Sequence, residues 1–230
     1  MVGIGRLVSR ALDLALPARC VGCQVEGPPF CAACAPALDA RLDLPAGVPM
    51  GLPSDIPAPL LQLEWCAPFS GSIRRALHEL KYGGERRLAD PLGRAIARRW
   101  GRVSAGGDVI VSVPVHADRA RVRGYDQAEL IAMVAARELA LPMAPILERV
   151  RATSAQFDLD RATRATNVDG AFRLRPPPRP PSHTSPPLAG RWVVLVDDVV
   201  TTGATLAACA GPLLEAGAVG VSAIAVARER

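Results

Sequence analysis

The sequence has few aromatic residues, almost no lysine and no long uncharged apolar run. Aromatic residues make up 4% of the 230 residues, although half of the chain is hydrophobic, so a core must come mostly from alanine, valine and leucine. No stretch of membrane-spanning length is free of charge, which argues against membrane insertion. Residues 4–16 have the spacing of a short amphipathic helix, and Arg6, Arg10 and Asp13 interrupt it. Because a signal peptide has an uninterrupted apolar region, we expect a cytoplasmic protein.

Lys81 is the single lysine among 27 basic residues. A coding bias toward arginine explains this composition more simply than selection for nucleic-acid binding, and the net charge of +5 permits polyanion partners without requiring them. A lysine ammonium is a compact charge that a guanidinium fork does not replace beside a phosphate. Lys81 follows a helical pattern that runs from Ser70 through Leu77. It is therefore either a charge that stabilises a helix end or a residue of a functional site.

Four of the six cysteines form two Cys-x-x-Cys pairs, Cys20 with Cys23 and Cys31 with Cys34. Each pair can present two thiolates to one tetrahedral ion. Redox pairs normally occur singly after a strand, and a cytoplasmic location disfavours disulfides. The spacing therefore favours a structural Zn²⁺ site with no open coordination position. A proline-rich stretch at 45–59 follows and is typical of an extended linker, so we expect an N-terminal unit over 1–60 and a main domain over 61–230.

Apolar runs alternate with helical patterns through the main domain. Strands are expected at 63–69, 108–115, 142–150, 171–174, 193–196 and 221–227, with helices over 70–80, 88–100 and 130–139. This alternation predicts an α/β fold in which helices flank a parallel sheet. The polar segment 151–170 has few core anchors and is typical of a mobile hood over a site. The Pro- and Ser-rich insert at 176–188 is expected to be disordered, and we assign it no function.

The stretch from Val193 to Thr205 carries most of the functional information. An apolar strand ends in two acids, Asp197 and Asp198, and a hydroxyl-rich turn from Thr201 then opens a helix. Backbone N–H groups and the macrodipole at a helix start favour an anion, and Gly203 lets the backbone approach it closely. The acids would repel a phosphate, so they must face hydroxyl groups or a cation, as on a sugar with Mg²⁺. The alternative is an ordinary buried strand and a helix with Thr201 or Thr202 as its N-cap.

Three arginines follow the strand expected at 108–115. Arg119, Arg121 and Arg123 would lie in a loop at its carboxyl end, where open α/β sheets bind ligands. Their guanidinium groups suit a pyrophosphate or the phosphates of a nucleic acid. A solvated basic loop without a ligand is the third possibility.

The stretch from Val193 to Thr205 resembles the 5-phosphoribosyl-1-pyrophosphate (PRPP) signature of the type I phosphoribosyltransferases. The whole chain is similar to a narrower group, the ComF family of competence-associated proteins, which join a zinc ribbon to such a domain. The resemblance is carried by the two Cys pairs, Leu80-Lys-Tyr-Gly-Gly84, Arg121-Val-Arg-Gly-Tyr-Asp-Gln-Ala-Glu-Leu130, Asn167-Val-Asp-Gly-Ala-Phe172 and the signature. Two departures are a longer proline-rich insert before Arg191 and only four cysteines in the knuckle, so a second metal site is unsupported.

The resemblance implies PRPP binding with Mg²⁺ and, in members linked to competence, handling of single-stranded DNA. In it Asp197 and Asp198 hold the ribose hydroxyls and are the catalytic candidates. By the same resemblance, Lys81 binds the pyrophosphate together with Arg119 or Arg121. The 5′-phosphate is bound by the loop made of Val199, Thr201, Thr202, Gly203, Ala204 and Thr205. Turnover, the acceptor and the oligomeric state are left open. The alternative to a transferase is a PRPP-binding or DNA-handling module without catalysis, with Tyr125 available for base stacking.

Overall fold

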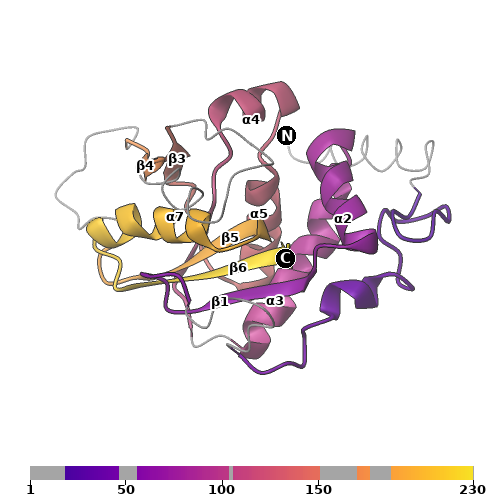
Figure 1. Ribbon diagram of the computed structural model, residues 1–230, viewed down its shortest axis with the longest axis horizontal. Coiled ribbons are helices and arrows are strands. Elements are labelled where there is room, and N and C mark those ends of the chain that lie inside the picture. Colours follow the sequence, from indigo (N-terminus) through magenta and orange to yellow (C-terminus); the bar gives the residue numbers. More distant parts are fainter. Residues whose placement is uncertain (1–18, 47–55, 104–105, 151–169, 177–187, 230) are drawn as a thin grey trace.

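The computed structural model describes residues 19–46, 56–103, 106–150, 170–176 and 188–229 (Figure 1). Several expectations fall outside these residues: the helix at 4–16, nearly all of the hood, most of the proline-rich insert and the middle of the linker. Among the described residues, no helix is both long enough and apolar enough to cross a membrane.

Four parallel strands form the central sheet, in the order β1–β6–β5–β2. Their bounds are Leu63–Pro68 for β1, Val109–Ser112 for β2, Trp192–Val200 for β5 and Gly220–Arg228 for β6. The sequence places these strands correctly, but β2 is shorter than expected and β5 is longer. The acid pair lies within β5 rather than after it, because pairing with β6 continues from Asp197 opposite Ala225 to Val200 opposite Arg228.

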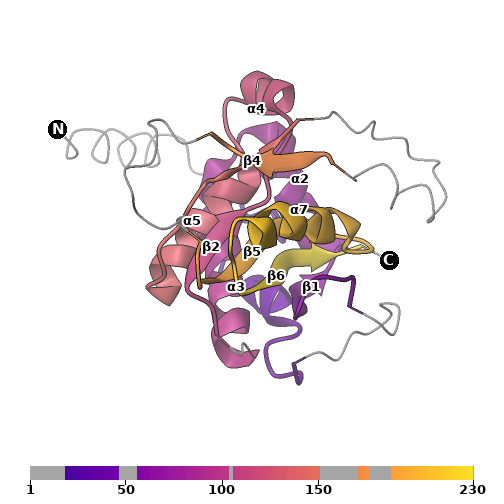
Figure 2. The ribbon, with the colours of Figure 1, turned by 90° about the vertical axis from the view of Figure 1, so that its left-hand side faces the viewer.

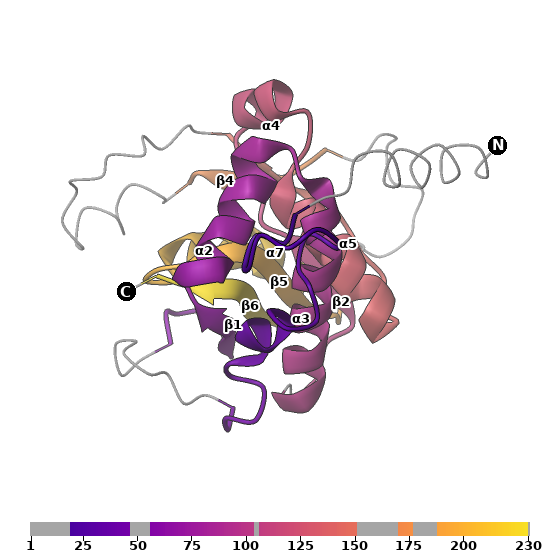
Figure 3. The ribbon, with the colours of Figure 1, turned by 90° about the vertical axis from the view of Figure 1, so that its right-hand side faces the viewer.

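Helices cover both faces of the sheet, which confirms the predicted fold class (Figures 2 and 3). Val194 and Val196 of β5 pack into one hydrophobic cluster with α2, α3 and α5, whereas Val193 and Leu195 pack into the other with α7. This alternation is the two-residue period of a strand that is buried on both faces. The helices are α2 Gly71–His78, α3 Ala89–Val103, α5 Gln127–Leu139 and α7 Ala204–Glu215.

The segment after β2 differs from the expected basic loop, because it forms a short helix, α4 Ala117–Arg123. His116 is its N-cap and accepts a hydrogen bond from the Asp118 N–H, and Gly124 ends it in a left-handed conformation. A small antiparallel ribbon, β3 Leu147–Arg149 and β4 Phe172–Leu174, lies on the same side of the sheet as α4 (Figure 1). The expected strand at 171–174 is confirmed, and the one at 142–150 forms only over its last residues.

A buried arginine joins the N-terminal segment to the sheet, and nothing in the sequence pattern indicated it. Arg99 of α3 is 1% exposed and donates from Nη2 and Nε to the Glu64 carboxylate of β1, at 2.7 and 3.1 Å. Its remaining N–H groups reach the backbone carbonyls of Arg41 and Leu44, at 2.5 and 2.6 Å. One side chain thereby fixes the chain that follows η1 Ala35–Asp39 against the edge of the sheet.

Candidate functional site

The two acids on β5 are both buried, with exposed fractions of 9% for Asp197 and 5% for Asp198. The Asp198 N–H donates to Asp197 Oδ1 at 2.8 Å. Burial opposes ionisation of both carboxyls, and for Asp197 the neighbouring charge of Asp198 adds to it, so the pKa of Asp197 stands well above its ordinary value. For Asp198 the Lys81 ammonium outweighs burial and lowers the pKa. The pair therefore holds one proton more readily than two isolated aspartates would.

Lys81 reaches the acid pair from a π-helical turn, η2 Glu79–Gly83, which follows α2 and ends at Gly84 in a left-handed conformation. Its Nζ forms an ion pair with Asp198 Oδ2, and the two side chains are 22% and 7% exposed. Burial alone would lower the pKa of Lys81, but the carboxylate charge of Asp198 raises it overall. Lys81 thus faces β5 rather than serving as a charge at the end of α2.

The turn after β5 carries the hydroxyl groups to the start of α7. Thr202 Oγ1 accepts a hydrogen bond from the Ala204 N–H at 3.3 Å, and Gly203 is the N-cap residue. Gly203 has φ of +83°, and a Cβ at this position would lie 2.9 Å from Pro57 Cγ and 3.1 Å from Leu63 Cδ2. Both the backbone conformation and the contact with the chain before β1 therefore require glycine.

A pocket of about 620 Å³ lies between η2 and α4. Lys81 and Tyr82 line one side, and Arg119 and Arg123, one helical turn apart on α4, line the other. Arg121 is on a different face of α4, where its side chain is 81% exposed and pairs with Asp118 at 3.6 Å. The structure thus brings Lys81 and Arg119 to opposite sides of one pocket and directs Arg121 to solvent.

The two tyrosines near this pocket have different surroundings. The Tyr125 hydroxyl donates a hydrogen bond to the Leu80 carbonyl, and the Arg86 guanidinium lies 4.4 Å from the Tyr125 ring centroid. Both the hydroxyl and one face of the ring of Tyr125 are therefore already in contact with the protein. Tyr82 is 70% exposed, and the Arg123 guanidinium lies 5.3 Å from its ring centroid. Tyr82, rather than Tyr125, presents an aromatic surface to solvent. Phe157, an aromatic residue of the expected hood at 151–170, lies outside the described residues.

Two charged residues reach the site although sequence reasoning gave them no role. Asp126 caps α5 by accepting the Ala128 and Glu129 N–H groups, and its other oxygen accepts the Val115 N–H at 2.8 Å. Burial, with a smaller effect from the charge of Asp198, raises its pKa above the ordinary value. Arg149 of β3 has its pKa lowered by burial and then by the nearby charge of Arg119. The capping-box spacing Asp126-x-x-Glu129 could have revealed the first residue, whereas no local signal marks the second.

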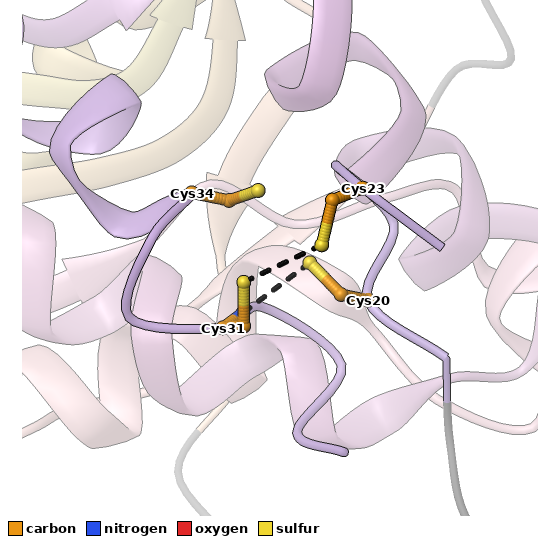
Figure 4. Close-up of side chains that lie close together, drawn as sticks. All are labelled: Cys20, Cys23, Cys31 and Cys34. Atoms are coloured by element: carbon orange, nitrogen blue, oxygen red, sulfur yellow. Dashed lines mark hydrogen bonds between the residues drawn. The ribbon is translucent and has the colours of Figure 1, made fainter. Parts of the chain in front are cut away.

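The four knuckle cysteines converge at the N-terminal end of the described chain (Figure 4). Their Sγ atoms all lie within 4.8 Å of one another, and those of Cys23 and Cys31 are 3.6 Å apart. Four thiolates about 2.3 Å from a shared tetrahedral ion would be about 3.8 Å apart, so the cluster fits such an ion. A Cβ on residue 22 would lie 2.4 Å from Cys34 Sγ, so a side chain larger than that of Gly22 would clash with the cluster. Burial opposes ionisation of Cys20, but hydrogen bonds from the backbone N–H groups of Cys31, Cys23 and Gly22 lower its pKa to about 6.

No family model matches the chain. Curated relatives do match it over most of its length: the DNA utilization protein YhgH of Salmonella typhi is 32% identical over 204 residues, which cover 82% of this chain and 86% of that protein. The same protein of Escherichia coli K12 is 34% identical over 72% of this chain and 71% of its own. Competence protein F of Haemophilus influenzae is 29% identical, with 85% and 83% covered.

The chain belongs to the ComF family. Solved structures with a partial likeness to this ComF-family protein include the glutamine PRPP amidotransferase of B. subtilis in complex with ADP and GMP, with a TM-score of 0.38 and 22% identity. A second is an allosteric regulatory enzyme of purine biosynthesis, with a TM-score of 0.37 and 20% identity. The superpositions cover 59% and 60% of this chain but only 25% and 26% of theirs, which is too little to place individual residues.

In this ComF-family chain the cysteine unit packs directly against the helical layer of the main domain. Val21 and Phe30 belong to the hydrophobic cluster of α2, α3 and α5. Arg75 of α2 donates to the Val21 carbonyl at 2.8 Å and to the Gly22 carbonyl at 3.1 Å. The loop that carries the first cysteine pair is therefore held in place by α2.

Proposed function

We propose that this ComF-family protein binds PRPP together with Mg²⁺ at the carboxyl end of β5 and transfers the phosphoribosyl group to an acceptor. The observation that carries the proposal is the buried pair Asp197 and Asp198, set beside Lys81 on the strand that leads to the helix start at Gly203. Carboxylates there suit hydroxyl donors, and the helix start suits a phosphate. The two preferences match the two ends of a ribose 5-phosphate.

The residues present fit PRPP and Mg²⁺ by their chemistry. Two carboxylates on one strand supply the oxygen ligands that Mg²⁺ prefers, directly or through the ribose hydroxyls. The 5′-phosphate would meet the N–H groups and hydroxyls of the loop from Thr201 to Thr205, with Val199 holding that loop on β5. When bound, Mg²⁺ would neutralise negative charge on the pyrophosphate.

The pocket beside α4 would hold the pyrophosphate. In the transfer, the bond from ribose C1 to a pyrophosphate oxygen breaks, and C1 forms a bond to the acceptor nucleophile. Negative charge then accumulates on the departing pyrophosphate, where the Lys81 ammonium and the Arg119 guanidinium would stabilise it. Arg121, whose side chain is directed to solvent, would contribute only through its longer-range charge. Because Lys81 also pairs with Asp198, binding of PRPP requires this ion pair to open or to be shared.

A nucleic-acid-handling function is the second candidate, and one feature of the structure favours it. The exposed ring of Tyr82 beside Arg123, with the basic helix α4, combines a stacking surface with phosphate-binding charge. The names of the relatives, DNA utilization protein and Competence protein F, point in the same direction. This function predicts an affinity for single-stranded DNA that falls steeply with salt, and binding that is absent or insensitive to salt would remove it.

Pyrophosphate release across a panel of purine and pyrimidine bases separates these functions. With PRPP and Mg²⁺ present, the transferase proposal predicts release that depends on one base and is lost in the Asp197→Asn variant. PRPP binding without release on any base would favour a binding module or sensor. An exposed acid outside the pocket beside α4, Asp43, gives the matched control, because Asp43→Asn changes a carboxylate that is 84% exposed.

We further propose that the four cysteines hold a structural Zn²⁺. The closed set of thiolates leaves no position for a reacting water, so the ion would stabilise the fold rather than take part in the chemistry. Cys34 would then bind as a thiolate, even though contact with Cys31 raises the pKa of its thiol to about 12 in the absence of an ion. Metal binding would release that proton.

Replacing Cys23 by serine is expected to lower the zinc content of the purified protein, from one ion per chain toward none. Cys23 is exposed, so its loss removes a ligand without opening a cavity in the core. The affinity should fall by about tenfold or more, measured with a chromophoric chelator. Cys66, a buried cysteine of β1 outside the cluster, supplies the control, since Cys66→Ala should keep its zinc. Equal zinc content in the Cys23→Ser and wild-type proteins would contradict the assignment.

A further inference from the structure

The ion pair between Lys81 and Asp198 lies where the proposed ribose site meets the proposed pyrophosphate pocket. Lys81 lines the pocket beside α4, whereas neither Asp197 nor Asp198 belongs to the described lining of that pocket. The Lys81 Nζ nevertheless pairs with Asp198 Oδ2. One ammonium therefore has a carboxylate on one side and a pocket that suits an anion on the other.

Neither partner of this ion pair is well compensated by water or by other charges. The side chains of Lys81 and Asp198 are 22% and 7% exposed. Among the residues that the structure describes, Lys81 is the only cation that pairs with Asp198. A largely buried charge that loses its partner is much more costly than an exposed one. Lys81 therefore leaves Asp198 readily only when another anion receives the ammonium and another group satisfies the carboxylate.

The two parts of PRPP would replace the two partners of this ion pair. The ribose hydroxyls would donate to Asp198, and the pyrophosphate would accept from Lys81. Ribose 5-phosphate presents the hydroxyls but no second anion, so it meets a carboxylate that Lys81 still holds. Inorganic pyrophosphate presents the anion but no hydroxyls. PRPP thus satisfies both Lys81 and Asp198 at once, which neither of its two parts does alone.

Lys81 can exchange one partner for the other by rotation of its side chain. Its ammonium is a compact charge on a flexible four-carbon stem, whereas a guanidinium fork suits one fixed bidentate partner. Lys81 is the only lysine among 27 basic residues, so this position departs from the arginine usage of the rest of the chain. It stands in the π-helical turn η2, a kind of turn that is frequent at functional sites. Its neighbours Tyr82 and Gly83 are exposed, so the core does not hold the turn on that side.

We propose that Lys81 makes the site select PRPP over ribose phosphates that lack a pyrophosphate, because it releases Asp198 only to an anion in the pocket beside α4. The inference rests on the proposed PRPP site and adds the order of preference among its ligands. Its signature is positive coupling: pyrophosphate draws the ammonium away from Asp198 and thereby raises the affinity for ribose 5-phosphate. Without the exchange, two anions bound side by side would repel each other or bind independently.

Calorimetry on the full chain measures this coupling. Ribose 5-phosphate is titrated at pH 8 and a fixed Mg²⁺ concentration, with and without inorganic pyrophosphate. Pyrophosphate should raise its affinity for the wild type by about fivefold or more. The Lys81→Met variant retains any coupling that passes through Mg²⁺, and it should lose most of this gain. No gain in the wild type, or an equal gain in the variant, would overturn the proposal.

The same variant separates selectivity from a loss of structure. PRPP affinity should fall by about tenfold or more in Lys81→Met, because a charge-assisted hydrogen bond to the pyrophosphate is lost. Ribose 5-phosphate alone should bind the variant at least as tightly as it binds the wild type, because Asp198 is then free. A purely structural role would weaken both ligands together, and that result would overturn the proposal. Arg98→Met, which breaks a surface ion pair with Asp39, should change neither affinity.

A measurement on the wild type needs no variant that must fold. Because the chain has one lysine, protein labelled with ¹³C at the lysine ε carbon gives a single lysine signal by NMR. PRPP with Mg²⁺ should shift this signal, whereas saturating ribose 5-phosphate should leave it near its ligand-free position. PRPP that binds without moving the signal, or ribose 5-phosphate that moves it as far, would overturn the exchange and leave the proposed function standing. A wild type that does not bind PRPP would overturn both.

Discussion

Replacing Arg99 by methionine should lower the free energy of unfolding by about 3 to 5 kcal/mol, a large part of the stability of a typical domain. The variant leaves the Glu64 carboxylate, which is 0% exposed, without its closest cation. It also removes the donors that satisfy the carbonyls of Arg41 and Leu44. Methionine fills much of the same space, so the loss reports the polar network rather than a cavity. Chemical denaturation followed by circular dichroism measures it.

Two further variants make this prediction specific. Arg102→Met alters an arginine on the same helix whose side chain is 65% exposed and 3.5 Å from Asp43, and it should change stability by no more than about 1 kcal/mol. Adding Glu64→Leu to Arg99→Met removes the buried charge and should recover part of the loss. A stability loss for Arg99→Met no larger than that for Arg102→Met would show that the network contributes little.

Replacing Lys81 by methionine should destabilise the protein by about 3 kcal/mol at pH 8 and by clearly less at acidic pH. The folded-state pKa of Asp198 is lowered, chiefly because the Lys81 ammonium outweighs burial. In the wild type this pair contributes stability above the unfolded pKa of the carboxyl, and the contribution is lost as the pH falls through the lowered folded value. In the variant, burial without a cation raises the pKa of Asp198, so the carboxyl takes up a proton and escapes the penalty as the pH falls.

Thermal unfolding of the wild type and the variant at pH 8 and pH 4.5 measures this effect. The difference in stability between the wild type and Lys81→Met should be smaller at pH 4.5 than at pH 8, by roughly half or more. Arg98→Met is the matched control, because the ion pair of Arg98 with Asp39, at 2.7 Å, lies at the surface with 42% of the arginine side chain exposed. A Lys81→Met deficit that is equal at both pH values would contradict the assigned ion pair.

Local patterns in the sequence predicted much of the fold. Apolar runs located all four strands of the parallel sheet, and the 3.6-residue period located α2, α3 and α5. The paired Cys-x-x-Cys spacing predicted a cluster that the structure confirms. The end of β5 was misplaced because adjacent acids are typical of a strand end, whereas pairing with β6 continues through both. The helix α4 was missed because its arginines and valine show no apolar face; none of its residues is buried.

The charged contacts could not be predicted in the same way, because they join residues far apart in the chain. Arg99 and Glu64 meet only because α3 packs across β1, and Lys81 reaches Asp198 only because a π-helical turn extends α2 toward β5. Periodicity gives the face on which a side chain lies, but it does not give the partner on another element. The same holds for a second pocket, of about 510 Å³, whose lining residues Arg41, Trp65 and Arg228 come from three separate segments.

The central claim is that the acid pair on β5 binds the ribose of PRPP, and calorimetry with PRPP and Mg²⁺ tests it most directly. The account predicts saturable binding to the wild type, a loss of about tenfold to a hundredfold in affinity for Asp197→Asn, and no loss for Asp43→Asn. Full PRPP affinity in a folded Asp197→Asn protein would contradict the assigned role of the pair. No binding to the wild type would show that the loop after β5 is not a PRPP site.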